Sequence, residues 1–206
     1  MSKKHWILLL TMIFGALSTV EAQSSKAYQR QLKKHRKEYK LDFLKNPSAP
    51  LDRKGVKKLR FFDADPAYRV IAKFEPIEYA DPFDMATYAG TTQPYVQYGI
   101  LHFELKGVKH ELTLYRSLRL RNMPGYEDYL FLPFKDLTNG EATYGGGRYL
   151  DFKTGDIKDF EVVLDFNQCY NPYCAYSDGY QCPIPPVENH LNVAIPVGEK
   201  AYGAEH

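Results

Sequence analysis

Apolar and polar positions alternate with two different periods along this chain. Between residues 25 and 45 the apolar side chains recur at helical spacing, and most of the remaining positions are Lys or Arg. These apolar positions are Tyr28, Leu32, Tyr39 and Phe43. Ser24 or Ser25 is a good N-cap, and Asn46-Pro47 stops a helix. The pattern predicts one basic helix, and we expect its apolar stripe to pack on the body of the protein.

From Leu59 onward the pattern changes to short runs of β-branched and aromatic residues separated by Pro, Gly, Asn and Asp. The predicted strands are Leu59 to Phe62, Tyr68 to Glu75, Met85 to Ala89, Val96 to Leu105, Val108 to Tyr115, Tyr129 to Pro133, Thr143 to Tyr144, Arg148 to Phe152, Glu161 to Asp165 and Leu191 to Val197. The expected fold is therefore mainly β, with an antiparallel barrel-like or sandwich body preceded by one N-terminal α-helix.

One hairpin can be predicted with its register. If Lys106-Gly107 is a two-residue turn, one face of the hairpin is apolar and the other carries complementary charges. The apolar face pairs Leu105 with Val108, Phe103 with His110 and Leu101 with Leu112, and the polar face pairs Glu104 with Lys109 and His102 with Glu111. This register predicts a core or near-core position for His110 and a surface position for His102, so neither needs a catalytic role.

The N-terminus has the composition of a secretory signal peptide. Lys3-Lys4-His5 precedes an apolar run from Trp6 to Leu17, and Val20-Glu21-Ala22 places small residues at a cleavage site. The run is shorter than the roughly 20 residues that span a bilayer, although a retained anchor is an alternative. We expect a signal peptide over 1–22, a basic helix and linker over 23–58, and a single β-rich domain over 59–206. The product is expected to be exported, to the periplasm or the outside.

Charge is unevenly distributed. Residues 26–60 carry 13 Lys and Arg but 3 Asp and Glu, a net charge of +10, whereas residues 61–206 carry 12 and 21, a net charge of −9. Docking of the basic segment on the acidic body, attraction to an anionic surface, and simple solvation are all compatible with this asymmetry, and docking is preferred. Membrane association after signal cleavage is not expected, and neither is nucleic-acid binding. The oligomeric state stays open.

The three cysteines are first of all disulfide candidates, because an exported chain meets an oxidising environment. Their C-x4-C-x7-C spacing matches no tetrahedral zinc signature, so no metal site is expected. We predict a bridge between Cys174 and Cys182 and a buried, unbridged Cys169.

Standard catalytic and cofactor motifs are absent: the sequence has no H-E-x-x-H, G-x-S-x-G, Walker A or C-x-x-C. The glycine run at residues 145–147 lies between two short predicted strands and opens no helix, so a bend or bulge is favoured over a phosphate cradle. No cofactor is predicted.

Polar side chains gather in two segments bounded by turns, residues 134–151 and 165–189. Loops stiffened by prolines and a disulfide can hold side chains rigidly for binding. The candidate ligand-binding residues are Glu141, Tyr144, Arg148, Asp165, Asn167, Asn171, Glu188 and Asn189. We expect Arg148 to lie within ion-pair or hydrogen-bond distance of a carboxylate or carbonyl in residues 165–189. A structural ion pair that fastens loops to the sheet would account for Arg148 equally well.

These residues resemble a known family. The runs Leu132 to Asp151, Leu164 to Tyr176, Cys182 to Asn189 and Gly198 to Lys200 resemble the bacterial and archaeal family catalogued as domain of unknown function 1684, over roughly Ala27 to Tyr202. The resemblance implies no established activity. It marks as family signature Asp136, Thr138, Thr143, Tyr144, Gly145, Gly147, Arg148, Asp165, Asn167, Asn171, Pro172, Cys174, Cys182, Pro183, Glu188, Asn189, Gly198 and Glu199. The family often has Ala where this chain has Cys169, which fits a packing role for that thiol. Because some relatives look like cytosolic proteins, the resemblance also implies an alternative for Cys174 and Cys182, a redox-active or metal-binding pair.

Three functions are compatible with the sequence. The preferred one is binding of a small polar or anionic ligand near Arg148 by charge-assisted hydrogen bonds. A hydrolase that uses Glu188 or Glu141 as acid/base, with Arg148 stabilising negative charge, is the enzymatic alternative. A structural or interaction module of the cell envelope is the third.

Overall fold

The computed structural model describes residues 26–203, and within that range the chain forms two compact units that divide between Tyr39 and Lys40. The predicted signal peptide and the predicted N-caps Ser24 and Ser25 lie outside the described residues. Within 26–203, no helix combines the length and the apolar character needed to cross a membrane.

The N-terminal helix spans residues 26–45 and ends just before Asn46-Pro47, as predicted. Leu32 and Phe43 of its apolar stripe are buried. In the second unit, the Phe43 ring contacts the rings of Tyr173 and Tyr176, each at a centroid distance of 5.5 Å. For Phe43, packing of the stripe is therefore confirmed.

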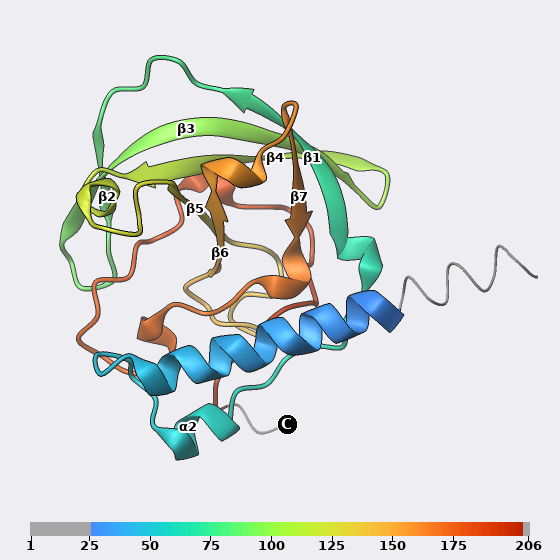
Figure 1. Ribbon diagram of the computed structural model, residues 1–206, viewed down its shortest axis with the longest axis vertical. Helices are drawn as coiled ribbons and strands as arrows, with labels where there is room; N and C mark the ends of the chain where they lie inside the picture. Colours follow the sequence, from blue (N-terminus) through green and yellow to red (C-terminus); the bar gives the residue numbers. More distant parts are fainter. Residues whose placement is uncertain (1–25, 204–206) are drawn as a thin grey trace, which may run out of the picture. The chain divides into compact units, whose positions relative to one another are not determined.

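The second unit is built on seven antiparallel strands in one curled, half-barrel sheet (Figure 1), so the mainly β prediction is confirmed. The strands are β1 (Arg69–Pro76), β2 (Phe83–Ala86), β3 (Thr92–Leu105), β4 (Val108–Ser117), β5 (Tyr129–Phe134), β6 (Arg148–Lys153) and β7 (Glu161–Asp165). Their order is β6-β5-β4-β3-β1-β7, and β2 pairs with β3.

Short helices connect these strands. They are α2 (Arg53–Lys57), η1 (Pro66–Tyr68), η2 (Leu120–Asn122), η3 (Thr154–Asp156), η4 (Phe166–Gln168), η5 (Tyr173–Ala175) and η6 (Val187–Asn189). The carboxylate of Asp52 caps α2 by accepting from the N–H groups of Lys54 and Gly55. These hydrogen bonds to the charged form lower the pKa of Asp52.

Three predicted strands are not formed. Within residues 59–62 only Phe61 makes a bridge, to Glu199, and within 143–144 only Thr143 does, to Asn139. Residues 191–197 are irregular, yet Leu191, Ile195 and Val197 are buried in the main core. Alternating apolar residues therefore indicated burial correctly in this last segment, but their backbone bonds to loops instead of a neighbouring strand.

The β3–β4 hairpin has the predicted register at all five pairs. Lys106 and Gly107 both have positive φ, 53° and 79°, which a two-residue turn of this kind requires. His102 lies on the outer face, 3.0 Å from a Glu111 oxygen and 2.9 Å from a Glu75 oxygen. His110 is half-buried with its ring 5.6 Å from the Phe103 ring.

The two faces of the sheet bury different residues. The main core contains mostly Leu, Phe and Val side chains from β3 to β7. The second face carries a smaller aromatic cluster of Met85, Tyr95, Tyr115, Phe131 and Tyr149, with Phe83, Tyr129 and Tyr170 partly buried against it. Because neighbouring residues of a strand point to opposite faces, β6 contributes Arg148 to the first side and Tyr149 and Asp151 to the second.

Candidate functional site

Arg148 is completely buried and its charge is matched inside the fold. One guanidinium nitrogen donates to an Asp136 carboxylate oxygen at 2.7 Å and to the Ile195 carbonyl at 2.8 Å. The other donates to the Val197 carbonyl and, at 3.5 Å, to the Glu199 carbonyl. The prediction that Arg148 finds its partners in residues 165–189 is therefore wrong. Arg148 instead fastens the 195–199 segment to the sheet.

Asp136 completes this buried cluster. Its second oxygen accepts from the Thr138 N–H and hydroxyl and from the Ile195 N–H. Gly198, at φ +76°, passes so close to Cys169 that an added Cβ would collide with the thiol sulfur. Cys169 is buried and unbridged, as predicted, and burial raises its pKa to about 11. The cluster is thus closed by close packing as well as by hydrogen bonds.

All three asparagines of the predicted site are buried, and their side chains bond backbone groups: Asn167, Asn171 and Asn189. Asn189 donates to the Thr113 and Pro133 carbonyls and accepts from the Thr113 N–H, so its amide joins β4 to β5. Asn167 exchanges two hydrogen bonds with the backbone of Asp65, and Asn171 donates to the Lys200 carbonyl. Each amide takes the place of a missing backbone partner and fastens a loop.

The other predicted site residues are distributed over the second unit. Asp165 is buried and accepts from the Asn167 N–H and from the Gln168 side chain. Glu141 is exposed in a turn, and Tyr144 is half-buried with its ring 6.3 Å from that of Tyr88. The glycine run forms a turn in which the Gly147 N–H donates to the Tyr144 carbonyl. Of the predicted set, Glu141, Tyr144 and Glu188 are therefore the residues that reach solvent.

A row of four residues crosses the second face. Gln97 of β3 lies opposite Tyr115 of β4, Tyr115 opposite Phe131 of β5, and Phe131 opposite Asp151 of β6. Adjacent strands are about 4.8 Å apart, so the Cα atoms of Tyr115 and Asp151 are separated by roughly 10 Å. We call this row, with the carboxylates of Asp151 and Glu188 that it carries, the carboxylate ladder.

Asp151 is exposed, and tyrosine hydroxyls hold its carboxylate. Tyr129 and Tyr170 both donate to its Oδ1, at 2.8 and 2.6 Å. Burial, and then the Asp151 charge, raise the pKa of Tyr129 well above its ordinary value, so this phenol keeps its proton at neutral pH. Tyr126, which is exposed, packs edge-on against Tyr129 at 5.9 Å. The result is an oriented acid beside accessible aromatic rings.

Glu188 forms the other acidic group of the ladder. It is exposed on η6, and its Oε1 accepts from the Tyr115 hydroxyl at 2.8 Å and from the Gln97 amide at 3.4 Å. Burial and the adjacent Glu188 raise the pKa of Tyr115. Asn189, the residue after Glu188, is hydrogen-bonded to both β4 and β5, so Glu188 is held on a rigid part of the fold. Carboxylates accept hydrogen bonds only, so both ends of the ladder suit a ligand that supplies donors.

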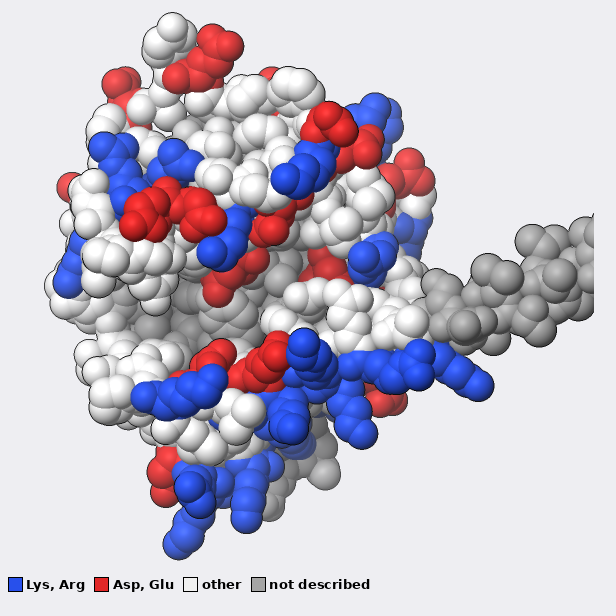
Figure 2. Space-filling view, in the orientation of Figure 1, with Lys and Arg blue, Asp and Glu red and all other residues white. Residues whose placement is uncertain are grey.

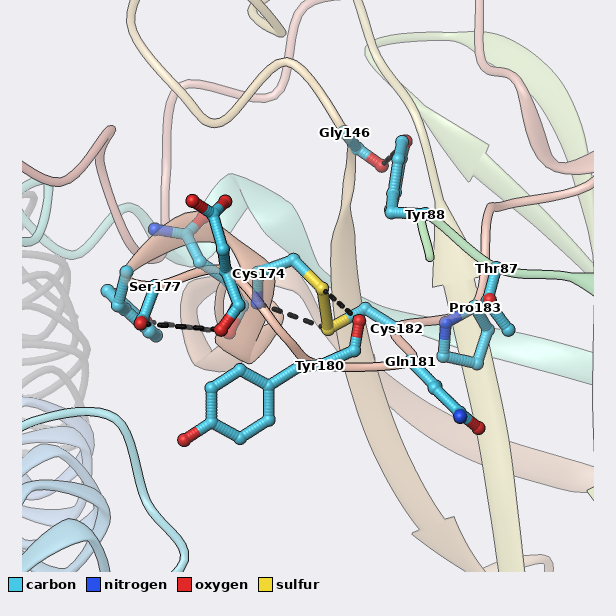
Figure 3. The surroundings of a disulfide bond; sticks show 12 residues. Thr87, Tyr88, Gly146, Cys174, Ser177, Tyr180, Gln181, Cys182 and Pro183 are labelled. Atoms are coloured by element: carbon cyan, nitrogen blue, oxygen red, sulfur yellow. Dashed lines mark hydrogen bonds between the residues drawn. A yellow bond between two sulfur atoms is a disulfide. The ribbon is translucent and has the colours of Figure 1, made fainter. Parts of the chain in front are cut away.

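A disulfide fastens the loop that adjoins the aromatic cluster. Cys174 and Cys182 are bridged, as predicted (Figure 3). The Tyr88 N–H donates to the Cys182 carbonyl, and the Ile184 N–H donates to the Ala86 carbonyl, so the segment runs beside β2. Tyr149 donates its hydroxyl to the Pro183 carbonyl. In Figure 3 Tyr88 reaches the Gly146 carbonyl, which it contacts at 2.8 Å. The bridge thereby stiffens one border of the second face.

A family model described as a protein of unknown function, DUF1684, matches residues 54–200. The chain belongs to the DUF1684 family. Its sequence is 33% identical to that of an uncharacterized protein of Haloarcula marismortui, whose solution NMR structure superposes with a TM-score of 0.66 over 86% of this chain and 96% of that one. No curated protein matches the sequence.

Sequence reasoning on this DUF1684 protein missed Asp151, Tyr115, Tyr129 and Gln97 as members of a site. Asp151 alternates with Leu150 and Phe152 in a predicted strand, which places it on the face away from the core. The sequence therefore already contained the signal that places Asp151 on this face. The contribution of Tyr115 and Gln97 depended on the β3–β4–β5 register, which no hairpin turn defines for β4 and β5.

Proposed function

We propose that this protein is a binding module for a small polar ligand rich in hydrogen-bond donors, held on the carboxylate ladder. The observation that carries the proposal is the orientation of two exposed carboxylates on one row of the sheet by the hydroxyls of Tyr115, Tyr129 and Tyr170. Pre-oriented charged acceptors recognise donors without paying for reorganisation. We further propose that the protein acts after export, on the basis of the N-terminal sequence.

Donor-rich ligands are favoured over anions because both acids are exposed, whereas Arg148 is enclosed by its own partners. A small anion at Arg148 would have to displace Asp136 and several carbonyls from a fully buried position. The same enclosure weighs against the hydrolase alternative, which needs Arg148 beside a reacting group. Hydroxyl groups and ammonium groups both supply the required donors.

The test is a thermal-shift screen with neutral sugars and polyols, small primary ammonium compounds, and inorganic anions. We expect donor-rich compounds to raise the Tm of the wild-type protein, and Asp151→Asn and Glu188→Gln to lose the shift. Asp81→Asn and Glu78→Gln, at exposed acids between β1 and β2, are matched controls that should keep it. A shift produced by anions alone and abolished in Arg148→Lys would overturn the proposal, as would a donor-dependent shift that both ladder variants retain.

A further inference from the structure

The helix over residues 26–45 has two faces of different chemistry. At about 100° per residue, Leu32, Tyr39 and Phe43 fall within roughly 40° of one another. Leu32 and Phe43 are buried, with relative exposures of 3% and 4%. The direction opposite this stripe carries Arg30, Lys34, Lys37 and Leu41, which fall within about 60° of one another, and all of these are exposed.

This exposed face is basic along its length and apolar toward its C-terminal end. Leu41 and Leu44 are 40% and 43% exposed and lie one turn apart, beside Lys37 and Lys45. Glu38, at the border of the face, forms an exposed ion pair with Lys34 at 3.7 Å. The expectation against membrane association considered only the apolar stripe that is now seen to be buried. It did not consider the two exposed leucines.

The short helix α2, which belongs to the second unit, is basic as well. Arg53, Lys54, Lys57 and Lys58, on α2 and at its C-cap, are all exposed. Figure 2 shows Lys and Arg side chains gathered over the helix and also over α2, with a few Asp and Glu side chains among them. Cations on one helix face are attracted to an anionic lipid surface, each contributing about as much as a several-fold change in affinity.

We propose that the exposed face of the helix, centred on Lys34, Lys37 and Leu41, docks the protein on a bilayer that contains anionic lipid. Charge complementarity points to an anionic partner, and the two leucines select a bilayer over a nucleic acid. Apolar side chains gain free energy by entering the boundary between headgroups and acyl chains, whereas phosphate groups of a duplex offer them nothing comparable. This proposal is independent of the carboxylate ladder.

The test is co-sedimentation of the full chain with vesicles of phosphatidylcholine, with or without 30% phosphatidylglycerol. Every variant retains residues 1–25, so any contribution from them is common to all. We expect stronger binding to the anionic vesicles, and a loss of roughly 10- to 30-fold in the double variant Lys34→Gln/Lys37→Gln. Lys73→Gln/Lys109→Gln, which removes two exposed lysines of β1 and β4, is the matched control and should bind as wild type does.

The variant Leu41→Ser/Leu44→Ser separates a bilayer from other polyanions because it leaves every charge in place. We expect it to weaken vesicle binding roughly tenfold and to leave any binding of duplex DNA unchanged. Equal binding to neutral and anionic vesicles, or the same loss in the Lys73/Lys109 control, would overturn the proposal. Unchanged vesicle binding by the leucine variant, together with DNA binding that needs Lys34 and Lys37, would reassign the face to a polyanion.

Discussion

Two polar regions lie on opposite sides of strand β6, and they differ in whether their charged group is enclosed or exposed. Arg148 points to the side where Asp136 and three backbone carbonyls enclose its guanidinium, and it has no exposed surface. Asp151, three residues later, points to the other side, where tyrosine hydroxyls orient its carboxylate but leave the residue exposed. The first region has the properties of a structural fastening, and the second those of a surface prepared for a partner.

The comparison also assigns a structural role to many residues of the family signature. Asp136, Arg148, Asn167, Asn171 and Asn189 are all buried and bond within the fold. Long irregular segments, such as 165–200, leave many backbone groups without a strand partner, and buried side chains supply those partners. In the described part of the chain, signature residues of this kind therefore explain the stability of the loops, and they need no ligand to account for them.

The largest effect is expected from breaking the closed region. Arg148→Met leaves the buried Asp136 carboxylate without its counter-charge and several carbonyls without donors, so it should lower the free energy of unfolding by about 3 to 5 kcal/mol. Denaturant unfolding measures this. Arg69→Met is the control, because Arg69 is 41% exposed and 3.8 Å from Asp165, and it should cost at most about 1 kcal/mol. Similar losses for the two variants would remove the contrast between enclosed and exposed charges.

A somewhat smaller effect is expected where an amide joins two strands. Asn189→Ala removes three hydrogen bonds and leaves Thr113 and Pro133 backbone groups buried without partners, so it should cost about 2 to 3 kcal/mol. Asn122→Ala removes one exposed bond, to the Leu118 carbonyl, and should change stability by less than about 1 kcal/mol. If Asn189→Ala were as mild as Asn122→Ala, the amide would be replaceable by water, and the fastening role would be wrong.

The sequence predicted more of the sheet than of the buried side-chain hydrogen bonds that hold the loops to it. Alternation and the Lys106-Gly107 turn were enough for the β3–β4 register, because a two-residue turn and one apolar face determine it together. The disulfide and the buried Cys169 were also predicted correctly. The partners of Arg148 were not, because they are backbone carbonyls of an irregular segment, and sequence pattern carries no information on which carbonyl a long side chain meets. The carboxylate ladder required the pairing of β4 with β5, which meet at a single register pair.

The smallest effect tests the tyrosines that underlie the open region, through pH. Burial raises the pKa of Tyr95 to about 12, whereas in the unfolded chain it ionises near 10. Between these values the folded state holds a proton that the unfolded state has lost. The contribution of Tyr95 is therefore complete below pH 10 and decreases by about 2 kcal/mol as the pH rises to 12.

Denaturant unfolding of the wild type and of Tyr95→Phe, measured at several pH values from 9 to 12, isolates this contribution from that of every other titrating group. We expect the free-energy difference between the two proteins to be constant below pH 10 and to shift in favour of Tyr95→Phe above it. A difference that stays constant up to pH 12 would mean that the Tyr95 hydroxyl reaches water in the folded protein. The aromatic cluster would then be a hydrated surface, and the tyrosines could not hold the carboxylate ladder in a fixed orientation.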